Sequence, residues 1–200
     1  MANTEHLTLV KQGRWMEWKK YYPDIELDLR EAQLSNINLM GINLSGADLS
    51  YANLIGADLR ETDLSGADLS HANLIGTNMR KANLRGAYLI EAKLNRTNLS
   101  EADIINANFS QANLENANLY EVEAIGTYFY QTRFYQAKLI QAHLSKAYLF
   151  GADLTLVDLE KADLRWTNLT KANLEGANLK GANLQGANLS KTNLKNAILP

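Results

Sequence analysis

Histidine, aspartate and serine are the side chains of this sequence that could act as bases, nucleophiles or metal ligands. Of the three histidines, His71 and His143 lie 72 residues apart and His6 stands near the N-terminus, so they form no ligand set. The aspartates and serines recur at regular intervals without a neighbouring base that would activate a nucleophile. Phosphate-binding loops and dinucleotide fingerprints are absent. We therefore predict no catalytic residue, no cofactor site and no metal site.

Charge and cysteine content exclude further classes of function. The 200 residues include 20 basic and 22 acidic side chains, a net charge of −2, which predicts no general attraction to nucleic acid or anionic lipid. Without cysteine the chain has no disulfide, thiolate nucleophile or cysteine zinc site. The N-terminus lacks an unbroken apolar stretch, and no apolar run is long enough to span a bilayer. We expect a cytoplasmic protein without membrane or nucleic-acid partners.

The aspartates and serines belong to a repeat of five residues, seen in GADLSYANLIGADLRETDLSGADL at residues 46–69. From Leu29 to Leu199 every fifth residue belongs to one series of 35 positions, of which 29 are leucine. The exceptions are Met79, Ile104, Phe109, Ala124, Phe129 and Phe134. Two residues earlier, alanine or threonine occupies 30 of 35 positions. No insertion interrupts either series, so one backbone unit must repeat along the chain.

A period of five fits neither a helix nor a flat strand. A helix would spread the leucines around its axis, and a strand would send them to alternate faces. An Ala-x-Leu segment that is briefly extended directs both side chains inward, and the next two residues must then turn the chain. Eleven of the twelve glycines stand two residues after the leucine, where a turn needs positive φ. The Asn or Asp before the leucine is suited to hydrogen-bond that turn. These units predict an all-β solenoid with a narrow, filled interior.

The motif A(D/N)LXX, repeated over residues 27–200, resembles the pentapeptide repeat family. The resemblance implies a right-handed quadrilateral β-helix, the repeat-five-residue fold, with four pentads in each of about nine coils. Residues twenty apart would then lie in adjacent layers, so Phe109 should stack on Phe129. Ala124 precedes two phenylalanines, which indicates an exchange of volume among the sides of one coil, with a cavity as the alternative.

The two ends differ from the repeat and from each other. Residues 1–25 are expected to form a short helical cap, with helices near Glu5–Lys11 and Arg14–Tyr22, before a β-helix over residues 26–200. The aromatic stripe of the second helix suits either the cover of the first coil or a partner-binding helix, and we favour the cover. The leader also resembles those of cyanobacterial members of the family. The C-terminal coil stays in phase to the last residue, which suggests an end-to-end homodimer through that coil.

The surface departs from the repeat between residues 120 and 150. Six consecutive outward positions there hold neither Asn nor Asp: Glu123, Tyr128, Arg133, Lys138, His143 and Tyr148. With four pentads per coil, aromatic side chains gather on one face. We call this set the aromatic ribbon, and it comprises Tyr88, Tyr128, Tyr130, Tyr148 and Phe150. Exposed aromatic groups of this kind either bind a partner or stabilise the sheet by stacking on one another.

Two functions from different classes fit the sequence. The first is a non-enzymatic scaffold for protein–protein interaction, with an unidentified protein partner and a regulatory role in a cyanobacterium. The second follows from the resemblance, because some family members mimic DNA and bind DNA gyrase or related topoisomerases. Such mimicry needs a strongly negative surface, and a net charge of −2 does not favour it.

Overall fold

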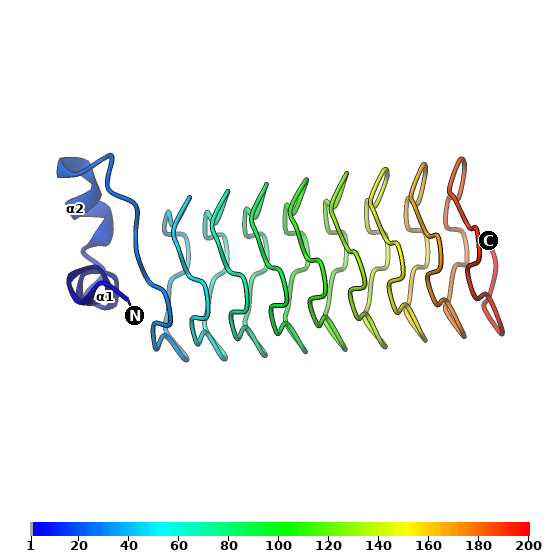
Figure 1. Ribbon diagram of the computed structural model, residues 1–200, viewed down its shortest axis with the longest axis horizontal. Helices are drawn as coiled ribbons and strands as arrows, with labels where there is room; N and C mark the ends of the chain where they lie inside the picture. Colours follow the sequence, from blue (N-terminus) through cyan, green and yellow to red (C-terminus); the bar gives the residue numbers. More distant parts are fainter. Residues whose placement is uncertain (1) are drawn as a thin grey trace.

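The computed structural model describes residues 2–200 and shows a rod-like solenoid with two short helices at its N-terminal end (Figure 1). Helix α1 spans Thr4–Lys11 and helix α2 spans Trp15–Tyr21, close to the predicted ranges. The side chain of Asn3 caps α1 by accepting hydrogen bonds from the N–H groups of Glu5 (3.0 Å) and His6 (3.3 Å). None of the helices in residues 2–200 has the length and apolar character needed to cross a membrane.

The solenoid is held in register by parallel β-bridges between residues twenty positions apart. The series begins with Asp28 and Asp48 and advances five residues at a time to Asn178 and Ile198 without a slip. Within residues 2–200 these bridges are isolated, one for each pentad, and no longer strands form. The predicted right-handed quadrilateral β-helix with four pentads per coil is therefore confirmed.

A pentad with Asn or Asp at its outward position, between neighbouring coils, satisfies its five backbone N–H groups in one scheme, which Ala47–Tyr51 illustrates. The N–H of Ala47 closes a turn onto the pentad before, that of Asp48 donates to the coil before, and those of Leu49 and Tyr51 donate to the coil after. The acceptors are the carbonyl oxygens of Leu44 (3.0 Å), Leu27 (2.9 Å), Asp68 (2.7 Å) and Ser70 (3.0 Å), respectively. The fifth N–H, that of Ser50, donates to Oδ1 of Asp48 at 3.0 Å. The outward Asn or Asp thus completes the backbone pairing.

This side-chain acceptor accounts for the repeat's preference for Asn and Asp. All 25 Asn and Asp residues at the outward position, the residue before the central leucine, accept the N–H two residues later. The longer side chains at the outward positions Gln33 and Glu123 do not accept this N–H, which fits the preference of short side chains for bonding nearby backbone.

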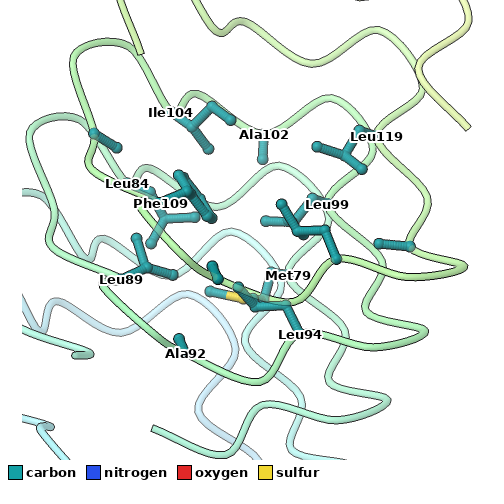
Figure 2. Close-up of a cluster of buried hydrophobic side chains, with 14 of the residues drawn as sticks. Met79, Leu84, Leu89, Ala92, Leu94, Leu99, Ala102, Ile104, Phe109 and Leu119 are labelled. Carbon is teal, nitrogen blue, oxygen red and sulfur yellow. The ribbon is translucent and has the colours of Figure 1, made fainter. Parts of the chain in front are cut away.

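The interior is a continuous column of aliphatic side chains, nearly all fully buried (Figure 2). Phe109 and Phe129 pack with their ring centroids 5.4 Å apart, as predicted, and Phe129 meets Phe134 edge to face at 5.1 Å. The inner threonines hide their hydroxyl groups by donating to a backbone carbonyl, as Thr62 does to Leu39 at 2.8 Å. Alanine and threonine are therefore the residues that fit this narrow interior. The exchange of volume around Ala124 stays a prediction.

Helices α1 and α2 cover the first coil through buried aromatic and aliphatic side chains. His6 and Trp15 are buried, and the ring of Trp15 stacks on that of Trp18 at 5.0 Å. Nδ1 of His6 accepts the backbone N–H of Asp28 at 3.0 Å, where a preceding coil would otherwise supply a carbonyl. Of the two predicted roles for the second helix, this arrangement favours a cover for the first coil rather than a partner-binding helix. A domain boundary at residues 25 and 26 stays a prediction.

The corner position, two residues after the leucine, has positive φ as expected, but it does not require glycine. All 34 residues from Glu31 to Asn196 at this position have positive φ, yet only eleven are glycine. Side chains here lean toward the next coil, so that the ring of Trp166 lies against Gly186. The ladder of hydrogen bonds imposes the left-handed conformation on the other residue types, at a cost of about 1 kcal/mol each.

We expect glycine to be required only where a bulky side chain leans on it. Gly66→Ala, with no atom near the added methyl group, should lower the free energy of unfolding by about 1 kcal/mol through backbone strain alone. Gly186→Ala should cost at least about 1 kcal/mol more, because the methyl group would overlap the Trp166 ring. Thermal or urea unfolding measures both values. Equal losses for the two variants would show that the Trp166 contact does not matter.

Candidate functional site

The aromatic ribbon lies on one face of the solenoid, where bridged residues are stacked. The rings of Tyr128 and Tyr148 are 4.8 Å apart and nearly parallel, with an interplanar angle of 4°. Tyr130 and Phe150 form a second stacked pair at 5.6 Å and 10°. Tyr128, Tyr130 and Tyr148 are each more than 40% exposed. The coil spacing of about 4.8 Å holds these rings in contact along the sheet.

Two members of the ribbon, Tyr88 and Phe150, have surroundings that the sequence did not predict. Tyr88 is 51% exposed, but Asn108 separates it from Tyr128 in the bridged column, so it stands apart from the stacked rings. Phe150 is partly buried, and Nζ of Lys171 lies over its ring, 5.2 Å from the centroid. Sequence reasoning missed this cation. The sequence spacing could have predicted this contact, because Lys171 occupies the corner position one coil after Gly151, the residue that follows Phe150.

The ribbon interrupts the backbone scheme of the fold. At the six consecutive outward positions from Glu123 to Tyr148, no Asn or Asp oxygen reaches back to the turn. In residues 2–200, the N–H groups that these six positions leave without an acceptor belong to Ile125, Tyr130, Tyr135, Ile140, Ser145 and Phe150. These donors lie on the surface, where water or another molecule can accept from them. The segment gains aromatic contacts and gives up six hydrogen bonds.

A shallow groove runs beside the ribbon along one corner of the solenoid. Its walls are the corner residues Glu91, Gln111 and Gln131 and the outward residues Lys93, Asn113 and Arg133. We call it the basic groove. Lys93, Asn113 and Arg133 are successive members of one bridged column, so the two cations lie two coils apart with an asparagine between them. Both cations are exposed.

Elsewhere on the rod most arginines are neutralised by a neighbouring carboxylate. Arg60 pairs with Asp58 at 2.6 Å, and Arg165 pairs with Asp163 at 2.7 Å. In both cases the guanidinium lowers the pKa of the aspartate through a hydrogen bond. Arg80 likewise lowers the pKa of Glu101. Over residues 2–200 neither Lys93 nor Arg133 has such a partner.

A second groove, between two other faces, is acidic but internally paired. It is lined by Glu101, Glu121, Glu123, Gln141 and His143. Nδ1 of His143 lies 2.8 Å from Glu123. The hydroxyl of Tyr120 donates to Glu121 at 2.6 Å, which raises the pKa of Tyr120. No group of three metal-binding side chains occurs in the described part of the chain.

The sequence matches a protein-family model of the predicted family. That model, described as pentapeptide repeats, matches in eight copies over residues 28–66, 62–100, 82–119, 97–134, 127–165 and 162–199. These segments coincide with the bridged coils and leave the two helices outside. A search of curated proteins found no significant match.

The solved structures similar to this chain include three that are described below. HetL, a pentapeptide repeat protein involved in heterocyst differentiation regulation in the cyanobacterium Nostoc sp. strain PCC 7120, is 32% identical over 92% of this chain and 96% of its own, with a TM-score of 0.38. Rfr23 from the cyanobacterium Cyanothece 51142 is 36% identical over 50% of this chain and 62% of its own, with a TM-score of 0.34. Trypsin-treated QnrB1, a plasmid-mediated fluoroquinolone resistance protein, is 20% identical over 82% and 77%, with a TM-score of 0.49.

Restoring the repeat rule in the ribbon tests whether the stacked rings hold the fold together. In Tyr128→Asn/Tyr148→Asn, two new side-chain acceptors worth about 1 kcal/mol each offset the loss of a stacked pair worth about 0.5–1.5 kcal/mol. We expect the free energy of unfolding to change by less than about 1 kcal/mol in urea denaturation.

The matched control is Asn168→Ala on the same face. It removes only the acceptor for the Thr170 N–H, at 3.1 Å, and should cost about 1 kcal/mol. A loss above about 3 kcal/mol in the double variant would make the ribbon a structural element of the fold.

Proposed function

This chain belongs to the pentapeptide repeat family, and from that premise we propose that it is a rigid, non-enzymatic scaffold that binds a protein partner through the aromatic ribbon. The observation that carries the proposal is the two adjacent pairs of stacked rings on one face of the solenoid, Tyr128 with Tyr148 and Tyr130 with Phe150. Tyrosine is enriched at interface hot spots because it combines a large apolar area with a hydroxyl group.

The fold presents these rings in a fixed arrangement. Each coil is bonded to the next through three N–H groups per pentad, and the stacked rings restrict one another further. Because these side chains are already ordered, they lose little conformational entropy when a partner binds, which favours affinity. Six consecutive pentads in this segment depart from the Asn/Asp rule. Departures from a local rule are expected at functional sites, so this pattern also supports a binding role for the segment.

A regulatory role in a cyanobacterium is part of the proposal. It is supported by the identity with HetL over most of both chains, and by the second cyanobacterial relative, Rfr23. The process that HetL serves is a property of that protein. For this chain we propose only that a regulatory protein of the same type of organism is the partner.

The alternative, a DNA-mimic that binds DNA gyrase or another topoisomerase, has less physical support. Its likeness to QnrB1 is limited to the fold at 20% identity. A DNA-like surface needs rows of uncompensated negative charge. Here the carboxylates of Asp58, Glu101 and Asp163 each bind an arginine, and the net charge is −2.

End-to-end self-association through the C-terminal coil stays a prediction. Leu184, Leu189 and Leu194 are only partly buried, and Ile198 and Leu199 are 58% and 57% exposed. Two such edges placed together would bury these side chains and pair their backbone groups. Light scattering over a concentration series should show a dimer. A monomer at high micromolar concentration would exclude it.

Capture from an extract of the source organism tests the ribbon as the binding surface. The wild-type chain and Tyr128→Asn/Tyr148→Asn serve as bait, and we expect a partner that only the wild type retains. The loss should exceed about tenfold, because hot-spot aromatic residues contribute about 2 kcal/mol or more each.

Tyr51→Asn is the matched control, since Tyr51 is 59% exposed, stacks on His71 and lies outside the ribbon. It should leave capture unchanged. Equal capture by all three baits would refute the ribbon as the docking site.

A further inference from the structure

The basic groove offers two positive charges that the chain itself leaves unpaired. In its column of bridged residues, Asn73, Lys93, Asn113, Arg133 and Asp153 follow one another, so cations stand where the repeat normally carries Asn or Asp. Five of the eight arginines have a carboxylate partner: Arg30, Arg60, Arg80, Arg85 and Arg165. Within residues 2–200 Arg133 has no carboxylate partner. The carboxylate of Glu91 lines the same groove, but it lies 3.5 Å from Nδ1 of His71.

The same two positions leave backbone donors open. Between them, Oδ1 of Asn113 accepts the N–H of Glu115 at 3.0 Å. At Lys93 and Arg133 the side chain carries no acceptor, so the N–H groups of Asn95 and Tyr135 lack the oxygen that the repeat supplies elsewhere. Each position therefore combines a cation with an unfilled N–H. A carboxylate oxygen from outside would satisfy both groups in a charge-assisted hydrogen bond.

We propose that the basic groove binds an acidic, extended segment of the protein partner, with one carboxylate at Lys93 and another at Arg133. This inference rests on the proposed function and names the chemistry of its partner. The two positions are two coils apart, about 9.6 Å at the spacing of neighbouring strands. A polyproline II segment advances about 9.3 Å over three residues and returns to the same face, so acidic side chains three residues apart match the groove. Tyr135 and the neighbouring ribbon supply aromatic contacts of the kind such segments use.

A single-stranded nucleic acid also carries negative charge, but the ribbon is poorly suited to it. Bases bind such proteins by stacking on free aromatic faces. The facing sides of Tyr128 and Tyr148 are only 4.8 Å apart and cover one another, and Lys171 lies over Phe150. No base fits between rings at this spacing. The cations and open N–H groups therefore favour carboxylates of a protein.

Titration with a defined peptide tests the proposal. The probe is acetyl-Glu-Pro-Pro-Glu-Pro-Pro-Glu amide, followed by amide chemical shifts of the labelled protein, and its control has Gln in place of every Glu. We expect saturable shifts at the N–H groups of Asn95 and Tyr135, at least about tenfold weaker binding of the Gln peptide, and weakening as KCl rises from 50 to 300 mM.

The decisive variant is Lys93→Asn/Arg133→Asn, which restores the repeat rule and should fold at least as stably as wild type. It should bind the Glu peptide at least about tenfold more weakly. Lys146→Asn/Lys180→Asn removes two charges elsewhere and should bind like wild type. Undetectable binding of the Glu peptide, equal affinity for the Gln peptide, an unchanged affinity in the first variant, or tighter binding of oligo(dT) at the same groove would each overturn the proposal.

The captured partner separates this inference from the proposed function. Loss of capture in both the ribbon variant and Lys93→Asn/Arg133→Asn supports both. Loss only in Tyr128→Asn/Tyr148→Asn leaves the scaffold function standing and refutes the acidic segment.

Discussion

The parallel pairing of each residue with the one twenty positions later is the constraint on which the molecule depends. Once it is set, the backbone has three donors per pentad committed to neighbouring coils and one to a turn. Leucine must then point inward, the corner must adopt positive φ, and the fifth N–H needs a side-chain acceptor. The regular surface follows from the same pairing, because every outward side chain is stacked between two others. Stability is shared along the column, as in other repeat proteins.

The sequence was sufficient for the parts of the fold that depend on local geometry. The uninterrupted leucine series predicted the register, and with the family resemblance it placed Phe109 on Phe129. Gly13 and Pro23 bounded the two helices of the cap. These features are readable because each follows from periodicity or from one residue's backbone preference.

Other features depend on contacts between coils, which the sequence does not state. The glycine pattern suggested that corners require glycine, whereas the hydrogen-bond ladder forces residues as large as Trp166 into the same conformation. Asn108 interrupts the ribbon next to Tyr88, and Lys171 covers Phe150, because the column beside each ring matters as much as the ring. The basic groove was missed because Lys93 and Arg133 are forty residues apart in sequence and only the winding brings them into one groove. The ribbon and this groove lie side by side where the Asn/Asp rule fails, and we propose that they form one binding surface.

A coil of four pentads places Tyr128 against Tyr148. Nuclear Overhauser effects between assigned aromatic side chains measure this directly in solution. We predict strong effects between the rings of Tyr128 and Tyr148, and between those of Phe109 and Phe129. Contacts of Tyr128 with His143 or Asp153 instead, fifteen or twenty-five residues away, would mark a different winding and contradict both the ribbon and the groove.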